Sequence, residues 1–253
     1  MLLFSRAQLL AVIAVFCLTT SAVAAPVVLF DESHGQHFLA GKSGPLDLSE
    51  LAALYQANGF TVTSHSAGLT EETLASVDVL ILSGPFLPLS DREIEAVIGF
   101  IDAGGGLAIM LHIAPPVRDL LYRLDVDFTN GTLRETSQVI DGNPLDFKVS
   151  RMAAHPLTAG LESFSVFGAW ALRGTARHTT IVGETSPHGW VDLDHDNRLS
   201  TGDAVQTFGV MVAGEIGRGR YAVLGDDAVF QNRFLDQPNR QLALRLVGWL
   251  GSR

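Results

Sequence analysis

Short apolar runs alternate with amphipathic segments along the first half of the chain. Runs with the length and composition of buried strands lie at 26–30, 77–84 and 107–113, and residues 60–65 alternate as a half-buried strand does. Between them, apolar residues recur at helical spacing over 46–59, 70–76, 90–104 and 115–125. This order of strands and helices predicts right-handed crossovers and a parallel sheet covered on both faces.

Two of these predicted helices begin at residues that suit a capping box. Asp47 stands three residues before Glu50, and Ser90 stands three residues before Glu93. In a capping box the two side chains each accept a hydrogen bond from a backbone N–H that the helix leaves free. We therefore expect the helices to start at these two positions.

The second half of the chain departs from this pattern and then returns to it. From about 125 to 175 it reads as short strands and loops, which we interpret as a small β/loop excursion of the same domain. Strands are expected again at 179–184, 205–213 and 220–225, and a last helix over 238–250. The sequence thus predicts one α/β domain over 25–253 with a mainly parallel sheet.

The N-terminus has the layout of a secretory signal peptide over residues 1–24. Arg6 precedes an apolar run from Leu9 to Leu18, and Ala22 and Ala24 form an A-x-A cleavage pattern. The run is too short to span a bilayer as a helix, although a retained anchor helix is the alternative. We expect export to the periplasm or the extracellular space, with no transmembrane span after cleavage.

Composition limits the chemistry of the exported chain. Its only cysteine, Cys17, lies in the signal peptide, so no disulfide and no thiol nucleophile remain. The formal charge is −10, and removal of Arg6 with the signal peptide makes it −11. Such acidity argues against nucleic acid and anionic membranes as partners.

Polar residues follow three of the predicted strands, where ligands bind in open parallel sheets. The candidate ligand-binding residues are Asp31, Ser33, His34, His112, Asp226 and Asp227. Carboxylates beside imidazoles suit hydrogen bonding to a small polar ligand, or acid–base catalysis. The alternative is that Asp31 and Asp226 cap loops and that His112 is a core histidine.

The segment DLDHDNRLSTGD, residues 192–203, matches a twelve-residue calcium loop of the EF-hand type. Its candidate metal ligands are Asp192, Asp194, Asp196, the backbone carbonyl of Arg198, Ser200 and Asp203. Asn197 stands where glycine is usual, and asparagine tolerates the left-handed conformation required there. We expect this loop to bind Ca²⁺ within the α/β domain; the alternative is an aspartate-rich turn without metal.

Several stretches resemble the class I glutamine amidotransferase-like superfamily. They are VVLFDESHGQ, VDVLILSGPFLPLSDREIEAVIGFIDAGGGLAIML, AAHPLTAGL and GRGRYAVLGDDAVFQN, and ThuA-like, GldG-type and intraflagellar-transport-type domains look like relatives. The resemblance implies a three-layer flavodoxin-like sandwich. True amidotransferases carry a cysteine where this chain has His112, so it implies no amidotransferase activity. The link of ThuA-like proteins with carbohydrate suggests a sugar-like ligand.

Three functional interpretations follow. The first is an exported, non-catalytic binding or accessory module with a calcium loop and a strand-end pocket for a small polar ligand, for which the resemblance suggests a carbohydrate. The second is a hydrolase or isomerase in which His34 or His112 is the base and Asp31 orients it. The third is a protein-interaction module of an envelope complex.

Overall fold

The computed structural model describes residues 24–252, without the side chain of Asn130. The predicted signal peptide, except for its last residue, lies outside the described residues. Within them the helices are all too short or too polar to cross a membrane.

Five parallel strands form one half of the main sheet. Their order is β2 (Thr61–His65), β1 (Val27–Asp31), β3 (Val79–Ser83), β4 (Gly106–Met110) and β15 (Gly219–Leu224). β3 and β4 are buried at every position, as their continuous apolar runs predict. Because these strands are parallel, their carboxyl ends meet at one edge of the sheet.

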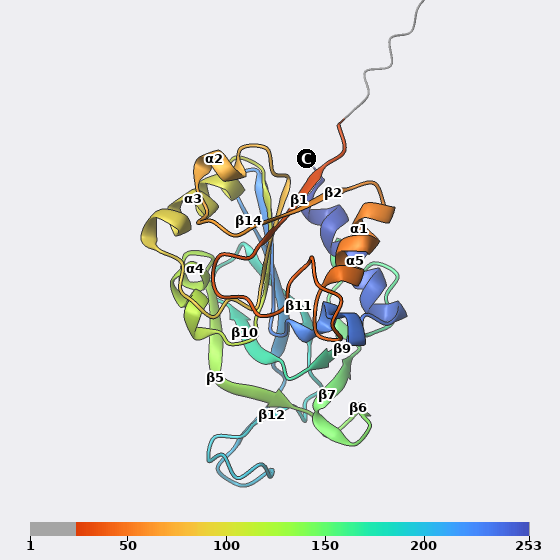
Figure 1. Cartoon of the computed structure of the whole chain (residues 1–253). Coiled ribbons are helices and arrows are strands. Elements are labelled where there is room, and N and C mark those ends of the chain that lie inside the picture. Colours follow the sequence, from red (N-terminus) through yellow and green to blue (C-terminus); the bar gives the residue numbers. More distant parts are fainter. Residues whose placement is uncertain (1–23, 253) are drawn as a thin grey trace, which may run out of the picture.

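Antiparallel strands extend the same sheet beyond β15. They are β14 (Gly209–Ile216), β10 (Trp170–Gly174), β5 (Val126–Arg134), β12 (Trp190–Val191) and β13 (Ala204–Val205), with β11 (Thr179–Glu184) and β8 (Arg151–Met152) attached beside β14. A second sheet contains β6 (Val139–Ile140), β7 (Asn143–Val149) and β9 (Phe164–Phe167). The chain between β12 and β13 projects from the body at the lower end of Figure 1.

The prediction of a mainly parallel sheet in a three-layer flavodoxin-like sandwich is wrong. The main sheet is a mixed one of twelve strands, and only about 25% of the chain is helical. β14 and β15 both look like buried parallel strands in sequence, but a tight turn at Gly217 and Arg218 joins them as an antiparallel hairpin. Gly217 has a φ of 56°, which hairpin turns of this kind require.

The segment 125–175 is also more integrated than a side excursion. β5 and β10 are members of the main sheet, and β6, β7 and β9 make the second sheet. Apolar side chains of β7 and β9 belong to the same core as those of β11 and β14. The second sheet therefore covers one face of the antiparallel half.

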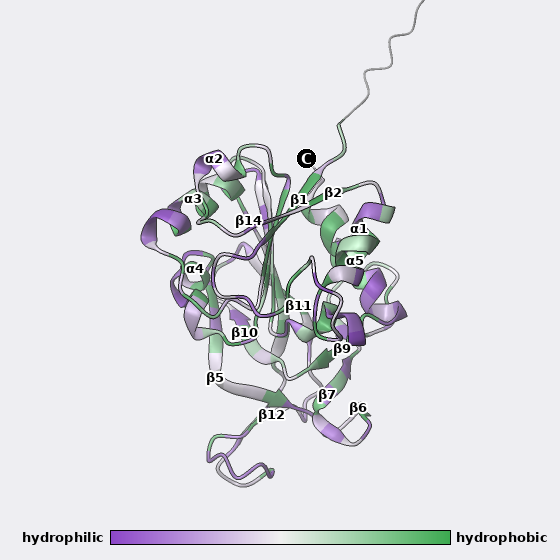
Figure 2. Cartoon of the chain, in the orientation of Figure 1, coloured by the Kyte–Doolittle hydropathy of each residue, from purple (hydrophilic) through white to green (hydrophobic). Residues whose placement is uncertain are grey.

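The helices flank mainly the parallel strands, although one of them also packs against β5. They are α1 (Ser49–Ala57), α2 (Glu71–Leu74), α3 (Asp91–Asp102), α4 (Arg118–Arg123) and α5 (Gln237–Leu250), with 3₁₀ turns at Pro115–Val117, Pro156–Thr158, Ala228–Phe230 and Asn232–Phe234. α2, α3 and α4 lie on one side and α1 and α5 on the other (Figure 1). Apolar side chains alternate along β4 into two cores, one on each face. Hydrophilic residues mark the outer turns of α2 and α3 (Figure 2).

One of the two predicted capping boxes forms. At the start of α3, Ser90 accepts a hydrogen bond from the backbone N–H of Glu93, and Glu93 accepts one from that of Ser90. α1 instead begins at Ser49, after Leu48, without a side-chain cap. Asp47 accepts hydrogen bonds from the N–H groups of Leu39 and Gly44, so it organises the preceding loop.

Candidate functional site

The carboxyl ends of the parallel strands carry the candidate ligand-binding residues, most of which form two clusters. Asp31 ends β1, and Ser33 and His34 follow it. His112 follows β4, and Asp226 and Asp227 follow β15. The parallel register therefore brings residues far apart in sequence to one edge, as the sequence predicts.

Asp31 is the centre of the first cluster and uses both carboxylate oxygens within the protein. Oδ1 accepts hydrogen bonds from the backbone N–H of Ser33 at 3.2 Å and from its hydroxyl at 2.6 Å. Oδ2 contacts His34 Nδ1 at 2.7 Å and accepts from Gln36 Nε2 at 2.5 Å. Because the side chain is buried, these contacts leave it little capacity for a ligand.

His34 is held between two carboxylates. Its second ring nitrogen, Nε2, lies 3.3 Å from Glu93 Oε1, at the start of α3. Burial lowers the pKa of His34, but the hydrogen bond and charge of Asp31, together with Glu93, outweigh it and raise the pKa above 6.5. His34 thus ties the loop after β1 to α3, and both ring nitrogens are engaged.

His112 and Asp227 form the second cluster, which is open to solvent on one side. Nδ1 of His112 lies 3.2 Å from Asp227 Oδ1, and the side chains are 40% and 3% exposed. The hydrogen bond to Asp227 raises the pKa of His112, and partial burial opposes it. The rings of Phe38 and Phe86 flank the imidazole, with centroids 5.6 and 5.0 Å away.

Two buried side-chain oxygens at the ends of β15 and β3 have no hydrogen-bond partner. They are Asp227 Oδ2 and Ser83 Oγ, and Ser83 ends β3. Asp227 Oδ2 packs against Gly84, where a side chain would collide with it. Unpaired buried oxygens are uncommon in proteins. The oxygens of Asp227 and Ser83 can therefore still bind a ligand, whereas those of Asp31 are already hydrogen-bonded within the protein.

Asp226 is separate from both clusters. It is buried and accepts hydrogen bonds from the N–H groups of Phe167 at 2.6 Å and Ala228 at 2.9 Å. Burial, and then the charge of Asp227, raise its pKa to about 7. Its contacts connect the end of β15 to β9 and to the turn at Ala228–Phe230, which is a structural role.

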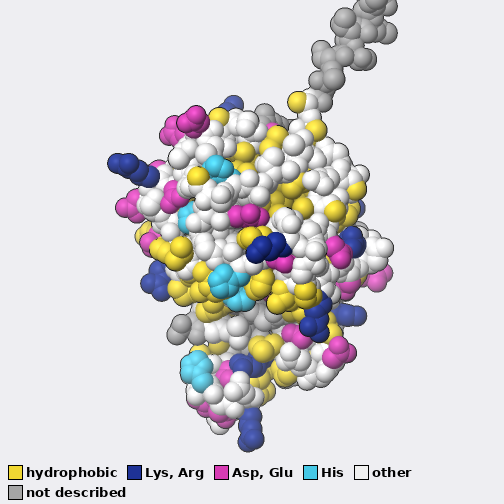
Figure 3. Space-filling model, viewed as in Figure 1, with side chains coloured by type: hydrophobic (Ala, Val, Ile, Leu, Met, Phe, Trp, Pro, Cys, Tyr) yellow, Lys and Arg dark blue, Asp and Glu magenta, His cyan; other side chains and the backbone are white. Residues whose placement is uncertain are grey.

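The Asp192–Asp203 loop brings its first three aspartates together. Asp192, Asp194 and Asp196 each offer an oxygen within 4.8 Å of the others. His195 and Asn197 have φ angles of 62° and 63°, so the left-handed conformation predicted for Asn197 is confirmed. In Figure 3 the projecting lower end of the molecule shows acidic, basic and histidine side chains side by side.

Asp192 anchors this loop to the body of the protein. Its side chain is 3% exposed, and Oδ2 accepts from the N–H of Asn197 at 3.0 Å and lies 3.1 Å from Arg134 Nη1. Oδ1 is buried and has no hydrogen-bond partner. A buried carboxylate oxygen without a partner is costly unless a cation or a donor reaches it.

The second half of the loop closes on Asp203. Its carboxylate accepts from the N–H groups of Ser200 and Leu193, and these bonds lower its pKa. Ser200 Oγ donates to Asp194 Oδ2 at 3.3 Å. The Arg198 side chain is exposed, and its N–H donates to Asp196 Oδ1 at 2.7 Å. The loop therefore folds back on itself, with Asp203 holding its two ends together.

Residues 41–247 match a family model described as Domain of unknown function (DUF4350). The chain belongs to this family. No curated protein matches the sequence.

Solved structures show the fold at low sequence identity. The mmIFT52 N-terminal domain is 18% identical, with a TM-score of 0.71, over 90% of this chain and 98% of that one. A putative ThuA-like protein from Bacteroides uniformis is 14% identical, with a TM-score of 0.56, over 91% and 93%. One from Parabacteroides merdae is 11% identical, with a TM-score of 0.54, over 91% of each.

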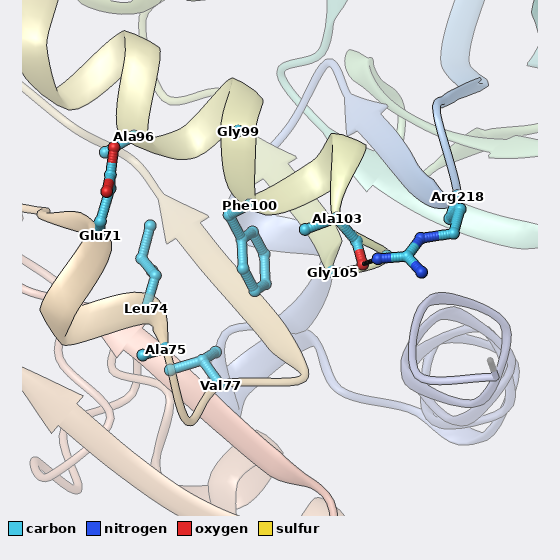
Figure 4. A pocket seen from close by; sticks show the side chains of 11 residues that line it. Glu71, Leu74, Ala75, Val77, Ala96, Gly99, Phe100, Ala103, Gly105 and Arg218 are labelled. Atoms are coloured by element: carbon cyan, nitrogen blue, oxygen red, sulfur yellow. Dashed lines mark hydrogen bonds between the residues drawn. The ribbon is translucent and has the colours of Figure 1, made fainter.

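A cavity of this DUF4350 domain lies at the opposite edge of the sheet. It has a volume of about 620 Å³ and lies between α2, α3 and the glycine turn before β4 (Figure 4). Its wall is mostly apolar, with Glu71 at one end and Arg218 at the other. Arg218 donates a hydrogen bond to the carbonyl of Ala103. None of the residues singled out in the sequence lines this cavity.

Sequence reasoning missed several residues of the strand-end edge. In the linear sequence Glu93 indicates only a helix cap, and no pattern marks Gln36, Ser83, Phe38 or Phe86. The sequence offers Asp31 as the partner of either His34 or His112; in the structure Asp31 contacts His34, and the carboxylate beside His112 is Asp227. Only the tertiary structure determines which carboxylate each histidine meets.

Proposed function

We propose that this chain is an exported, non-catalytic binding module whose Asp192–Asp203 loop binds calcium. The observation that carries the proposal is Asp192 Oδ1, a buried carboxylate oxygen without a partner, in a side chain grouped with those of Asp194 and Asp196. Calcium takes six to eight oxygen ligands, and carboxylates at alternate positions of a loop are its usual source. The signal-like N-terminus supports export, where calcium is abundant.

A binding role agrees better than catalysis with the first polar cluster. Asp31 is hydrogen-bonded to His34, Ser33 and Gln36. The other ring nitrogen of His34 contacts Glu93. A general base needs a ring nitrogen free to reach its substrate, and His34 has none. We infer that this cluster stabilises the fold beside the ligand-binding edge.

Two surfaces are available for binding. Leu193, Leu199 and Val205 are exposed apolar residues on or beside the calcium loop, and such a group suits a protein partner of an envelope complex. His112 and Asp227, between Phe38 and Phe86, suit a small polar ligand such as a carbohydrate. We also propose that the chain is a member of the class I glutamine amidotransferase-like superfamily.

Calcium is expected to bind the purified protein with a dissociation constant of about 10⁻⁴ to 10⁻³ M, the range of extracellular calcium modules. The double variant Asp194→Ala, Asp196→Ala removes two exposed ligands and should lose this binding. Asp119→Ala, an exposed acidic side chain on α4, is the matched control and should bind normally. Isothermal titration calorimetry measures all three. No heat at millimolar calcium, or equal binding by the double variant, would contradict the calcium site.

A hydrolase or isomerase is the second candidate, and the contact between His112 and Asp227 favours it. Asp227 holds Nδ1, which leaves Nε2 of a half-exposed imidazole for a substrate.

If this edge binds sugars, a thermal-shift panel of neutral mono- and disaccharides should stabilise the unmutated protein and not His112→Ala. Nitrophenyl glycosides test for turnover. Hydrolysis lost in both His112→Ala and Asp227→Asn would favour the enzyme, whereas sugar stabilisation without turnover would favour the binding module.

A further inference from the structure

We propose that Arg134 holds the Asp192–Asp203 loop in the geometry that calcium requires, an inference that rests on the calcium site proposed above. Arg134 is the last residue of β5 and pairs across the sheet with Trp190 of β12. Its guanidinium carbon lies 5.1 Å from the centroid of the Trp190 ring, and its side chain is only 13% exposed. Its backbone therefore belongs to β5 and its side chain packs on Trp190, both outside the loop.

The Arg134 guanidinium joins two separate positions of the loop. Nη1 lies 3.1 Å from Asp192 Oδ2, at the first position. Nη2 donates a hydrogen bond to Asn197 Oδ1 at 2.7 Å, at the sixth position. One rigid, planar group thus sets the distance between the first ligand and the sharp turn.

The contact with Asp192 orients its carboxylate. Arg134 and the N–H of Asn197 occupy Oδ2, so the oxygen left without a partner is Oδ1. A group that binds one oxygen of a metal-ligating carboxylate holds the other oxygen in position for the metal. The loss of such a group typically weakens metal affinity about 10- to 100-fold. The positive charge of Arg134 also offsets the repulsion among the clustered aspartates before the ion arrives.

The contact with Asn197 stabilises a backbone conformation that glycine would adopt freely. In the left-handed region a Cβ atom clashes with the backbone, so this conformation is less favourable for asparagine than for glycine. Anchoring of the Asn197 side chain by Arg134 offsets that cost. The need for Arg134 should therefore shrink when Asn197 is replaced by glycine.

The experiment is a double-mutant cycle of Arg134→Met and Asn197→Gly, with calcium affinity measured by calorimetry. Methionine keeps an apolar stem against Trp190 and removes the charge. Arg134→Met should weaken calcium binding about tenfold or more, and the loss should be smaller in the Asn197→Gly background. Arg173→Met, which breaks an exposed ion pair between β10 and Asp127 at the other end of β5, is the control and should leave affinity unchanged. Equal or tighter binding by Arg134→Met would overturn the inference, because Arg134 would then only compete with the ion.

Limited trypsin digestion without calcium separates this inference from the calcium proposal. Arg198 lies exposed in the loop, and the fragment masses identify cleavage there. Arg134→Met should be cut after Arg198 several-fold faster than the unmutated protein, and unchanged cleavage would overturn the Arg134 inference. Absence of calcium binding by the unmutated protein would instead contradict the proposed function.

Discussion

Asp31→Ala is expected to destabilise the folded protein by about 3–5 kcal/mol, the usual cost of removing one partner of a buried charged pair. The variant leaves His34, Gln36 and the Ser33 hydroxyl without the acceptor that all of them share. His34 and Gln36 are buried, so water does not readily replace Asp31 as their partner. The expected effect is thus on stability and not on ligand binding alone.

Urea unfolding followed by circular dichroism measures this loss. Asp119→Ala, the exposed acid on α4, should change stability by less than about 0.5 kcal/mol. A stability of Asp31→Ala within that margin would contradict the structural role of the cluster. Asp31→Asn keeps the shape of the side chain and should fall between the two, because an amide still accepts hydrogen bonds through its oxygen.

The same cluster predicts how stability varies with pH. The pKa of His34 is raised in the folded protein, so protonated His34 favours folding. This contribution is fully present below pH 6.5, the ordinary histidine value, and is lost as pH rises through the higher folded pKa. Asp31→Asn removes the nearest negative charge and should flatten that part of the stability profile.

Gly219→Ala is expected to cost more than about 3 kcal/mol, the upper part of the range for overpacking, and to reduce soluble expression. A Cβ atom at this position would overlap the carbonyl oxygens of Ile101 and Gly105. Both are backbone atoms, which cannot move aside as a flexible side chain would. Position 219 begins β15, so displacement there disturbs its pairing with β4.

Gly99→Ala is the matched control for this substitution. Gly99 lies within α3, and nothing stands within 4 Å of a Cβ added there. Alanine in a helix interior is favoured over glycine by about 0.5–1 kcal/mol, so this variant should gain stability. Thermal unfolding of both variants provides the comparison. A stable Gly219→Ala protein would show that the helix-to-strand turn can relax.

The local features of this protein could be predicted from sequence because short-range chemistry decides them. β1, β3 and β4 follow from apolar runs that only burial on both faces accommodates. The cap at Ser90 follows from two side chains three residues apart. The turn at Asn197 follows from the spacing of the aspartates and from the tolerance of asparagine for positive φ.

Strand direction and side-chain pairing were decided only in the tertiary structure. A buried apolar run reads the same in a parallel and an antiparallel strand, so β14 gave no sign that it turns back along β15. His112 contacts Asp227, which lies 115 residues away in the sequence. His34 contacts Glu93 at a separation of 59 residues, and Asp192 contacts Arg134 at a separation of 58. Such contacts depend on how the strands order themselves in space, because hydrogen bonds and charges act over a few ångströms of distance and not along the chain.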